Sequence, residues 1–176
     1  RKQAALRRII DDLDSYEGML VFTHHRQLDG VTETLHDRGI KYHQYTQHEG
    51  PNERAKLIDS FSRPDGGLDA LVGIHCLDEG VDVSSAQTAI LLASTGNPRQ
   101  FVQRRGRVLR QHESKERAQI YDLIVVPPRD RFDDLLDSER SLLLKQLERH
   151  TEFAETAQNS AEARRKVREV RAALED

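Results

Sequence analysis

Tryptophan is absent from this 176-residue chain, and aromatic side chains of all kinds make up only 5% of it. Aliphatic side chains must therefore form most of any core. The single cysteine, Cys76, excludes an internal disulfide and fits a reducing interior, so we expect an intracellular protein of the cytoplasm, nucleoid or nucleus. No apolar run approaches the roughly 18 residues of a membrane-spanning helix, and no signal-like segment is present. The sequence predicts no membrane partner.

An excess of one sign of charge is also missing. The 27 Lys and Arg residues nearly balance the 30 Asp and Glu residues, for a net charge of −3. No field of one sign covers the molecule, so any contact with nucleic acid must be local. The chain begins at Arg1 and is still helix-like at Asp176. We expect a piece of a longer protein, with one core domain and an appendage.

Apolar runs alternate with helical patterns along the first 128 residues. Apolar runs predict strands at 18–22, 68–77, 88–95 and 118–128, and an alternating pattern predicts one at 40–46. Helical spacing predicts helices at 1–13, 26–39, from 51 to about 61, and across 97–110. Gly39 is expected to end the second helix, and Pro51 to begin the third. This alternation predicts an α/β fold, a mostly parallel sheet with helices on both faces.

The pattern changes after Pro128. Residues 132–150 and 154–176 each have the spacing of a helix, and the second is strongly charged. We expect a helical extension or connector here, and a partner-binding helix is the alternative. The expected organisation is therefore a core domain over residues 1–128 and a helical extension over 129–176.

The segment QFVQRRGRVLR, residues 100–110, concentrates four arginines. On a helix, Gln103, Arg107 and Arg110 form one narrow stripe, and the apolar residues of the segment fall on the opposite side. Gly106 would cost about 1 kcal/mol in mid-helix, a cost that makes sense if something must approach the backbone closely. An amphipathic helix with a charged outer face is the alternative interpretation of the same stripe.

The spacing in QRRGRVLR resembles motif VI of superfamily 2 helicases and translocases. Upstream, ALVGIHCLDEGVDVSSAQTAILL resembles motif V, and GMLVFTHHRQLDGVTETL resembles motif IV with its following helix. The three motifs stand in the family's order. Over roughly residues 1–128 the chain is therefore similar to the C-terminal RecA-like lobe of such motors. It is most similar to the XPB-like and restriction-helicase branch.

The resemblance implies that ATP and Mg²⁺ are held mainly by an N-terminal RecA-like lobe of the same chain. Arg107 and Arg110 match the two arginine-finger positions, whose planar guanidinium groups suit the charge that spreads over the γ-phosphoryl oxygens. Gln103 matches the Gln or His position that couples the nucleotide cleft to the other lobe. Arg104 matches the arginine that follows it, and we expect it to organise the cleft rather than act as a finger.

Motif V supplies Gly80 and Asp82 as further nucleotide-binding candidates. The resemblance implies that Asp82 hydrogen-bonds the ribose or an arginine across the cleft, and an ordinary turn carboxylate is the alternative. Asp78 and Glu79 look like a Walker B pair, but no Gly-Lys pair occurs anywhere in the chain, so they are interpreted as surface or cleft carboxylates. A complete P-loop enzyme is therefore excluded for this segment, and we expect it to be inactive alone.

Nucleic-acid contacts are expected where the strands of motifs IV and V end, because loops there offer amides and short polar groups to phosphates. The candidates are Thr23, His24, Arg26, Gly73, Ile74 and His75. The resemblance favours DNA over RNA. Adjacent histidines at 24 and 25 lack the companion spacing of a metal site, so no metal is expected. The alternative to a motor lobe is a non-catalytic nucleic-acid-binding or scaffold module with a helicase-derived fold.

Overall fold

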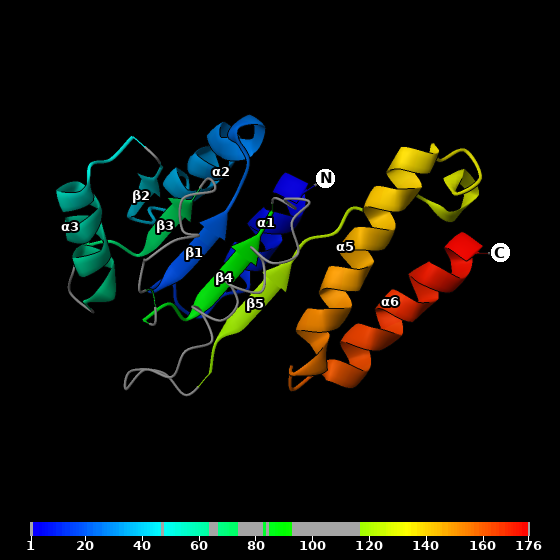
Figure 1. Ribbon diagram of the computed structural model, residues 1–176. Coiled ribbons are helices and arrows are strands. Elements are labelled where there is room, and N and C mark those ends of the chain that lie inside the picture. Colours follow the sequence, from blue (N-terminus) through cyan, green and yellow to red (C-terminus); the bar gives the residue numbers. More distant parts are fainter. Residues whose placement is uncertain are drawn as a thin grey trace. The chain divides into compact units, whose positions relative to one another are not determined.

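The structure, a computed structural model, describes residues 2–46, 48–63, 67–73, 83, 85–92 and 117–175 (Figure 1). These residues belong to two compact units. The sheet unit comprises the described residues up to 92 together with 117–123, and the helical unit comprises residues 124–175.

The sheet unit contains five parallel strands. They are β1 (Met19–Phe22), β2 (Tyr42–Tyr45), β3 (Ala70–Gly73), β4 (Thr88–Leu91) and β5 (Gln119–Asp122). Their order across the sheet is β2-β3-β1-β4-β5. The predicted α/β architecture with a parallel sheet is confirmed.

Three helices of this unit are described: α1 (Lys2–Asp11), α2 (His25–His36) and α3 (Pro51–Ser62). The connection from β1 through α2 to β2 runs toward one edge of the sheet, and the connection through α3 to β3 returns in the opposite direction. Because parallel crossovers are right-handed, two connections of opposite direction place their helices on opposite faces. Helices therefore cover both faces of the sheet, as the sequence predicted.

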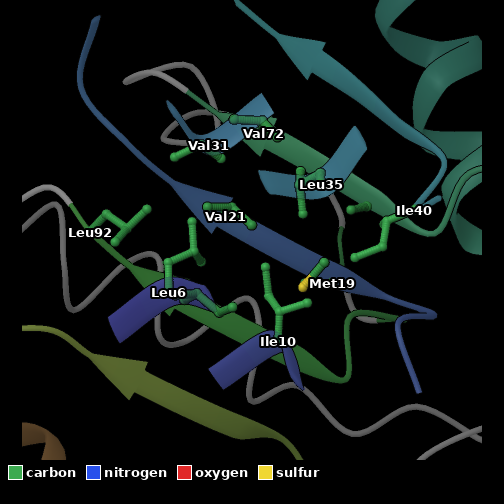
Figure 2. Packing of buried hydrophobic residues seen from close by; sticks show 11 residues of the cluster. Leu6, Ile10, Met19, Val21, Val31, Leu35, Ile40, Val72 and Leu92 are labelled. Atoms are coloured by element: carbon green, nitrogen blue, oxygen red, sulfur yellow. The ribbon is translucent and has the colours of Figure 1, made fainter. Parts of the chain in front are cut away.

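The core of the sheet unit is mainly aliphatic. Residues of α1 and α2 pack on one face of the central strands (Figure 2), in a cluster that includes Leu6, Ile10, Met19, Val21, Val31, Leu35, Ile40, Val72 and Leu92. Every residue of β1, β3 and β4 is buried, so both faces of the central strands are covered. This is the expected result for strands that read as continuous apolar runs.

Two predicted helix ends are confirmed. Gly39 has a φ of +66°, its amide donates to the carbonyl of His36 at 2.9 Å, and the amide of Ile40 donates to the carbonyl of Leu35 at 3.1 Å. These two bonds form a Schellman motif, which needs a left-handed residue at this place. Pro51 is the first residue of α3, where its fixed φ and missing N–H cost nothing.

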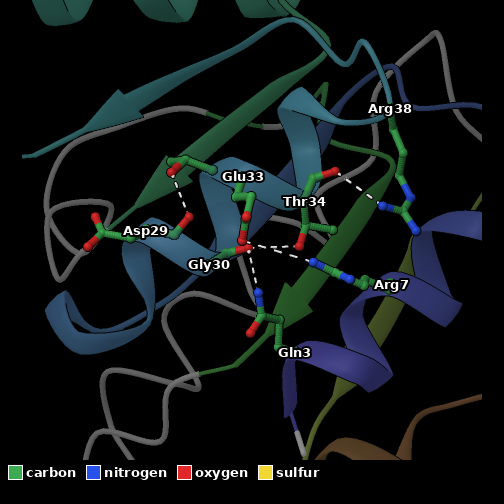
Figure 3. Close-up of polar contacts among 8 residues, drawn as sticks. Gln3, Arg7, Asp29, Gly30, Glu33, Thr34 and Arg38 are labelled. Carbon is green, nitrogen blue, oxygen red and sulfur yellow. Dashed lines mark hydrogen bonds and ion pairs between the residues drawn. The ribbon is translucent and has the colours of Figure 1, made fainter.

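Polar side chains join α1 to α2 along their exposed side (Figure 3). The Arg38 guanidinium donates to both carboxylate oxygens of Asp11, at 2.8 and 3.0 Å. This hydrogen-bonded pairing lowers the pKa of Asp11 and raises that of Arg38. One turn into α2, the Gly30 carbonyl accepts from the Thr34 hydroxyl at 2.7 Å and from the Gln3 amide at 3.4 Å. The contacts fix the register of the two helices on the sheet.

The helical unit consists of a short 3₁₀ turn (Arg129–Arg131), α5 (Asp137–Glu155) and α6 (Ser160–Glu175). Two helices after residue 128 were expected, but their predicted bounds were wrong. The first helix begins at Asp137, since the backbone N–H of Leu136 is capped by the Glu139 carboxylate at 3.1 Å. It continues to Glu155 because buried Ala154 extends its apolar stripe.

One predicted strand was too long. β5 ends at Asp122, whereas the apolar pattern predicted a strand to residue 128. β5 pairs only with the four residues of β4, and Pro127 and Pro128 have no N–H to continue a ladder. The helix predicted across 97–110 lies outside the described residues, and the boundary expected after residue 128 remains a prediction.

Candidate functional site

The five strands run parallel, so their carboxyl ends meet at one end of the sheet, called here the carboxyl edge. At this carboxyl edge Gly73, the last residue of β3, pairs with Phe22 of β1 on one side and with Tyr45 of β2 on the other. The amide of Thr23 donates to the Gly73 carbonyl at 3.1 Å. Two of the predicted nucleic-acid contacts, Thr23 and Gly73, are thus brought together from segments fifty residues apart in the sequence.

The start of α2 lies directly after this edge. His24 is the N-cap, and its Nδ1 accepts the backbone N–H of Arg26 at 3.3 Å. His24, His25 and Arg26 are all exposed, and no acidic residue occupies the first turn. The positive end of the helix dipole and the Arg26 guanidinium therefore both contribute positive potential at the start of α2. This is an arrangement that favours an anion.

Thr23 and Gly73 are placed differently from His24 and Arg26. Thr23 is only 2% exposed, and Gly73 is buried as well. The Thr23 hydroxyl points along its own backbone, 3.5 Å from the carbonyl of His24. Of the four described candidates, His24 and Arg26 are the ones that solvent reaches, while Thr23 and Gly73 hold the strand ends beneath them.

The turn after β2 reaches the same edge and was not singled out from the sequence. The Glu49 carboxylate accepts the Thr46 amide at 2.6 Å and the Thr46 hydroxyl at 3.0 Å. Arg54 of α3 donates to the Thr46 carbonyl at 3.0 Å, and its guanidinium lies 5.6 Å from the centre of the Tyr45 ring. A Thr-x-x-Glu pattern before Pro51 is the signal that predicts such a turn, since it is the pattern of a capping box.

This arrangement favours the ionised form of Glu49. Partial burial raises its pKa, but the hydrogen bonds from the amides of Thr46 and Glu49 and from the Thr46 hydroxyl lower the pKa further, so it lies below the ordinary value. The carboxylate is thereby committed to holding the turn.

The remaining predicted site residues lie outside the described part of the chain. These are Ile74, His75, Gly80, Asp82, Gln103, Arg104, Arg107 and Arg110, together with Asp78 and Glu79. Their assignments stay predictions.

Among the described residues, no group of three or more His, Cys, Asp or Glu side chains is arranged to hold a metal ion. No helix within the described ranges has the length and apolar character needed to cross a membrane.

The comparison with protein families gives a match over residues 1–112 to the helicase conserved C-terminal domain. The chain belongs to this family. The matched residues contain β1 to β4 and the segments interpreted as motifs IV, V and VI. The RecA-like lobe of a superfamily 2 helicase, expected from those motifs, is confirmed.

One curated relative is longer than the region that it shares with this chain. The chain is 30% identical over 116 residues to the DNA 3'-5' translocase XPB2 of Sulfurisphaera tokodaii, and the aligned region covers 64% of the chain and 25% of that protein. The chain thus spans about a quarter of the curated relative it matches.

Solved structures confirm the fold of a helicase C-terminal lobe. The C-terminal part of the Fun30 ATPase domain superposes with a TM-score of 0.62 at 20% identity, covering 85% of this chain and 53% of that one. The C-terminal domain of the DEAD-box protein Dbp5 superposes with a TM-score of 0.58 at 17% identity, covering 70% of each chain.

Proposed function

We propose that this chain is the second motor lobe of an ATP-dependent DNA translocase or helicase. The observation that carries the proposal is the family match over residues 1–112, which contains the motif VI segment whole. The relative XPB2 is described as a DNA translocase, which supports DNA over RNA as the substrate. Such a motor acts where DNA is found, in the cytoplasm, nucleoid or nucleus.

The nucleotide side of the proposal rests on donor chemistry. Arg107 and Arg110 offer N–H donors and positive charge, which suit phosphate oxygens, and the chain contains no Gly-Lys pair that could form a phosphate loop. These residues suit a nucleotide that another lobe holds and whose binding site this lobe completes. When bound there, ATP with Mg²⁺ would supply the phosphoryl transfer that drives movement.

Each residue then has a separate task. Arg107 and Arg110 would stabilise the charge on the transferring phosphoryl group. Gln103 and Arg104 would position them, and Asp82 beside Gly80 would accept a hydrogen bond at the ribose or from an arginine across the cleft. The partner required is an N-terminal RecA-like lobe of the same protein.

The nucleic-acid side rests on the carboxyl edge. Exposed His24 and Arg26 stand at the positive end of α2, with Thr23 and Gly73 directly beneath them. A phosphate at this place would meet backbone amides and charge without base readout. Ile74 and His75 follow Gly73 in the sequence and would extend the same contact.

The decisive experiment exchanges arginine for lysine in the full-length protein. Arg107→Lys or Arg110→Lys keeps the charge and removes the planar fork, so DNA-stimulated ATP turnover should fall by about two orders of magnitude or more, on the scale of an arginine finger. Nucleotide affinity should change far less. Arg104→Lys should cost less than either.

A matched control is Arg165→Lys on α6, where an exposed arginine pairs with Glu169. Lysine can keep that pair, so turnover should not change. Near-normal turnover in both the Arg107→Lys and Arg110→Lys proteins would contradict the proposal and favour a scaffold module.

The 176-residue chain alone gives a second test. It should neither hydrolyse ATP nor bind it tightly, because it offers donors for only one side of the phosphates. ATP hydrolysis by the purified chain that is not due to a contaminating ATPase would overturn its assignment as a second lobe.

A further inference from the structure

Helix α6 of the helical unit (Figure 1) carries three arginines at helical spacing, called here the arginine stripe. Arg164, Arg168 and Arg171 follow the spacing i, i+4, i+7, which places them within one narrow sector of the helix. Arg164 and Arg168 are exposed, and Arg171 is half-buried. The buried side of α6 is formed by other residues, with Val167 6% exposed and Leu174 3% exposed.

The arginine stripe has no ion-pair partner among the described residues. Within the described part of the chain, the guanidinium groups of Arg164, Arg168 and Arg171 make no hydrogen bond or ion pair. The other exposed cations of α6 are paired along the helix, Arg165 with Glu169 at 3.3 Å and Lys166 with Glu162 at 3.3 Å. The helix therefore separates one face of balanced charge from one face on which three arginines outnumber the single glutamate of the same sector, Glu175.

The length of the arginine stripe allows contact with more than one phosphate. At about 1.5 Å of rise per residue, Arg164 and Arg171 lie about 10 Å apart along the helix axis. Successive phosphates of one strand rise about 3.4 Å along the duplex axis, and long arginine side chains on a helix of this length can reach more than one of them. Guanidinium groups bind phosphates with directed N–H bonds, and they do so whatever the base sequence.

We propose that the arginine stripe of α6 is a phosphate-backbone contact for duplex DNA, separate from the carboxyl edge of the sheet. It would add affinity without sequence preference, and its contribution would be strongly salt-dependent. The inference rests on the proposed function, since it names a further contact to the same nucleic acid.

The test is a titration of the 176-residue chain against two duplexes of about 30 base pairs and unrelated sequence, followed by fluorescence anisotropy. Replacing all three arginines by glutamine should lower affinity for both duplexes at least about tenfold at about 50 mM salt. The slope of log affinity against log salt should fall by about one for each contact removed. The all-lysine variant keeps the charge and should stay within about threefold of the parent affinity.

The matched control is Arg165→Gln with Lys166→Gln, which removes two cations from the same helix but from its paired face. Affinity should change less than about threefold. Circular dichroism of each variant verifies that α5 and α6 are intact, and the all-lysine protein provides a folded comparison in any case.

Three outcomes would overturn the inference: an unchanged affinity in the all-glutamine variant, an equal loss in the control, or binding of phosphatidylserine vesicles with no binding of duplex DNA. These outcomes are independent of the ATP turnover of Arg107→Lys in the full-length protein, and it is that turnover that tests the proposed function. A loss confined to the all-glutamine variant would support the arginine stripe even if that turnover proved normal.

Discussion

The sheet unit and the helical unit build their cores in different ways. The ten largest fully buried side chains of the described residues all lie in the sheet unit, from Leu6 to Leu92. The helical unit packs Phe132, Leu143, Leu147, Val167 and Leu174 in one seam, and each keeps 2–6% of its surface exposed. Strands covered on both faces bury every side chain, whereas a pair of helices buries only the facing stripes.

Hydrogen bonds compensate for part of this difference. The Arg140 guanidinium of α5 donates to the carbonyl of Leu174, at the end of α6, and to the carbonyl of Phe132 at 3.2 Å. It thereby joins three segments of the helical unit and satisfies one of the carbonyls that a helix end leaves open. Packing therefore stabilises the sheet unit, whereas the helical unit is stabilised by its apolar seam together with the hydrogen bonds of Arg140.

The largest expected effect is a truncation in each core. Leu6→Ala should lower the free energy of unfolding of the sheet unit by about 4 kcal/mol, because the site is fully enclosed and cannot collapse around the cavity. Leu143→Ala should lower that of the helical unit by about 2 kcal/mol, because two helices can move together and fill part of the cavity. All four tyrosines lie between residues 16 and 121, so tyrosine fluorescence in urea follows the sheet unit, and helical circular dichroism adds α5 and α6. Equal losses would remove the distinction between the cores.

A backbone position of the sheet unit should come next. Gly18 has a φ of +69°, and a Cβ there would lie 3.1 Å from the Gln87 amide nitrogen and from the Ser85 carbonyl oxygen. Gly18→Ala should cost about 2–3 kcal/mol, since strain adds to a clash with backbone. Gly39→Ala is the control, with a φ of +66° and open space around it, and should cost about 1 kcal/mol. Urea unfolding of both variants measures the difference.

Glu49 predicts a pH dependence that belongs to the sheet unit alone. Its folded pKa is lowered, so its stabilisation is complete above the unfolded value of about 4.3 and is lost as the pH falls through the folded value. Glu49→Gln should cost about 1–2 kcal/mol at neutral pH, through weaker bonds to Thr46. The gap between parent and variant should narrow below about pH 4, and a gap independent of pH would contradict the ionised turn.

The smallest expected effect is on the helical unit. Glu162→Gln removes an exposed i,i+4 pair with Lys166 and should change stability by about 0.3 kcal/mol. Thermal unfolding followed by circular dichroism at low and at high salt measures it. A loss above about 1 kcal/mol would mean that surface pairs, and not the seam, hold α6 in place.

Much of the fold was predictable because its signals are local. Apolar runs located four strands and an alternating pattern located β2, and Gly39 and Pro51 marked the helix ends that the structure has. The errors in the helical unit arise where such local signals are missing. Near Thr156 the sequence has no glycine or proline to mark the end of a helix, so spacing alone did not locate the break between α5 and α6.

Less of the candidate site was predictable. Spacing assigned Thr23 and Gly73 to two motifs, but it could not tell that Thr23 is buried or that Thr46 and Glu49 stand at the same edge. Those facts depend on which strands are neighbours. The turn that Thr46 closes has a local signal, yet its place beside Gly73 has none.

The types of the elements, the order of the three motifs and the charge pattern of α6 can be read from local periodicity and spacing, which are properties of neighbouring residues. The position of β3 between β1 and β2, and therefore of Gly73 between the ends of both, depends on how the whole chain folds. Strand order is set by long crossovers and by burial on two faces, which couple residues far apart in the chain.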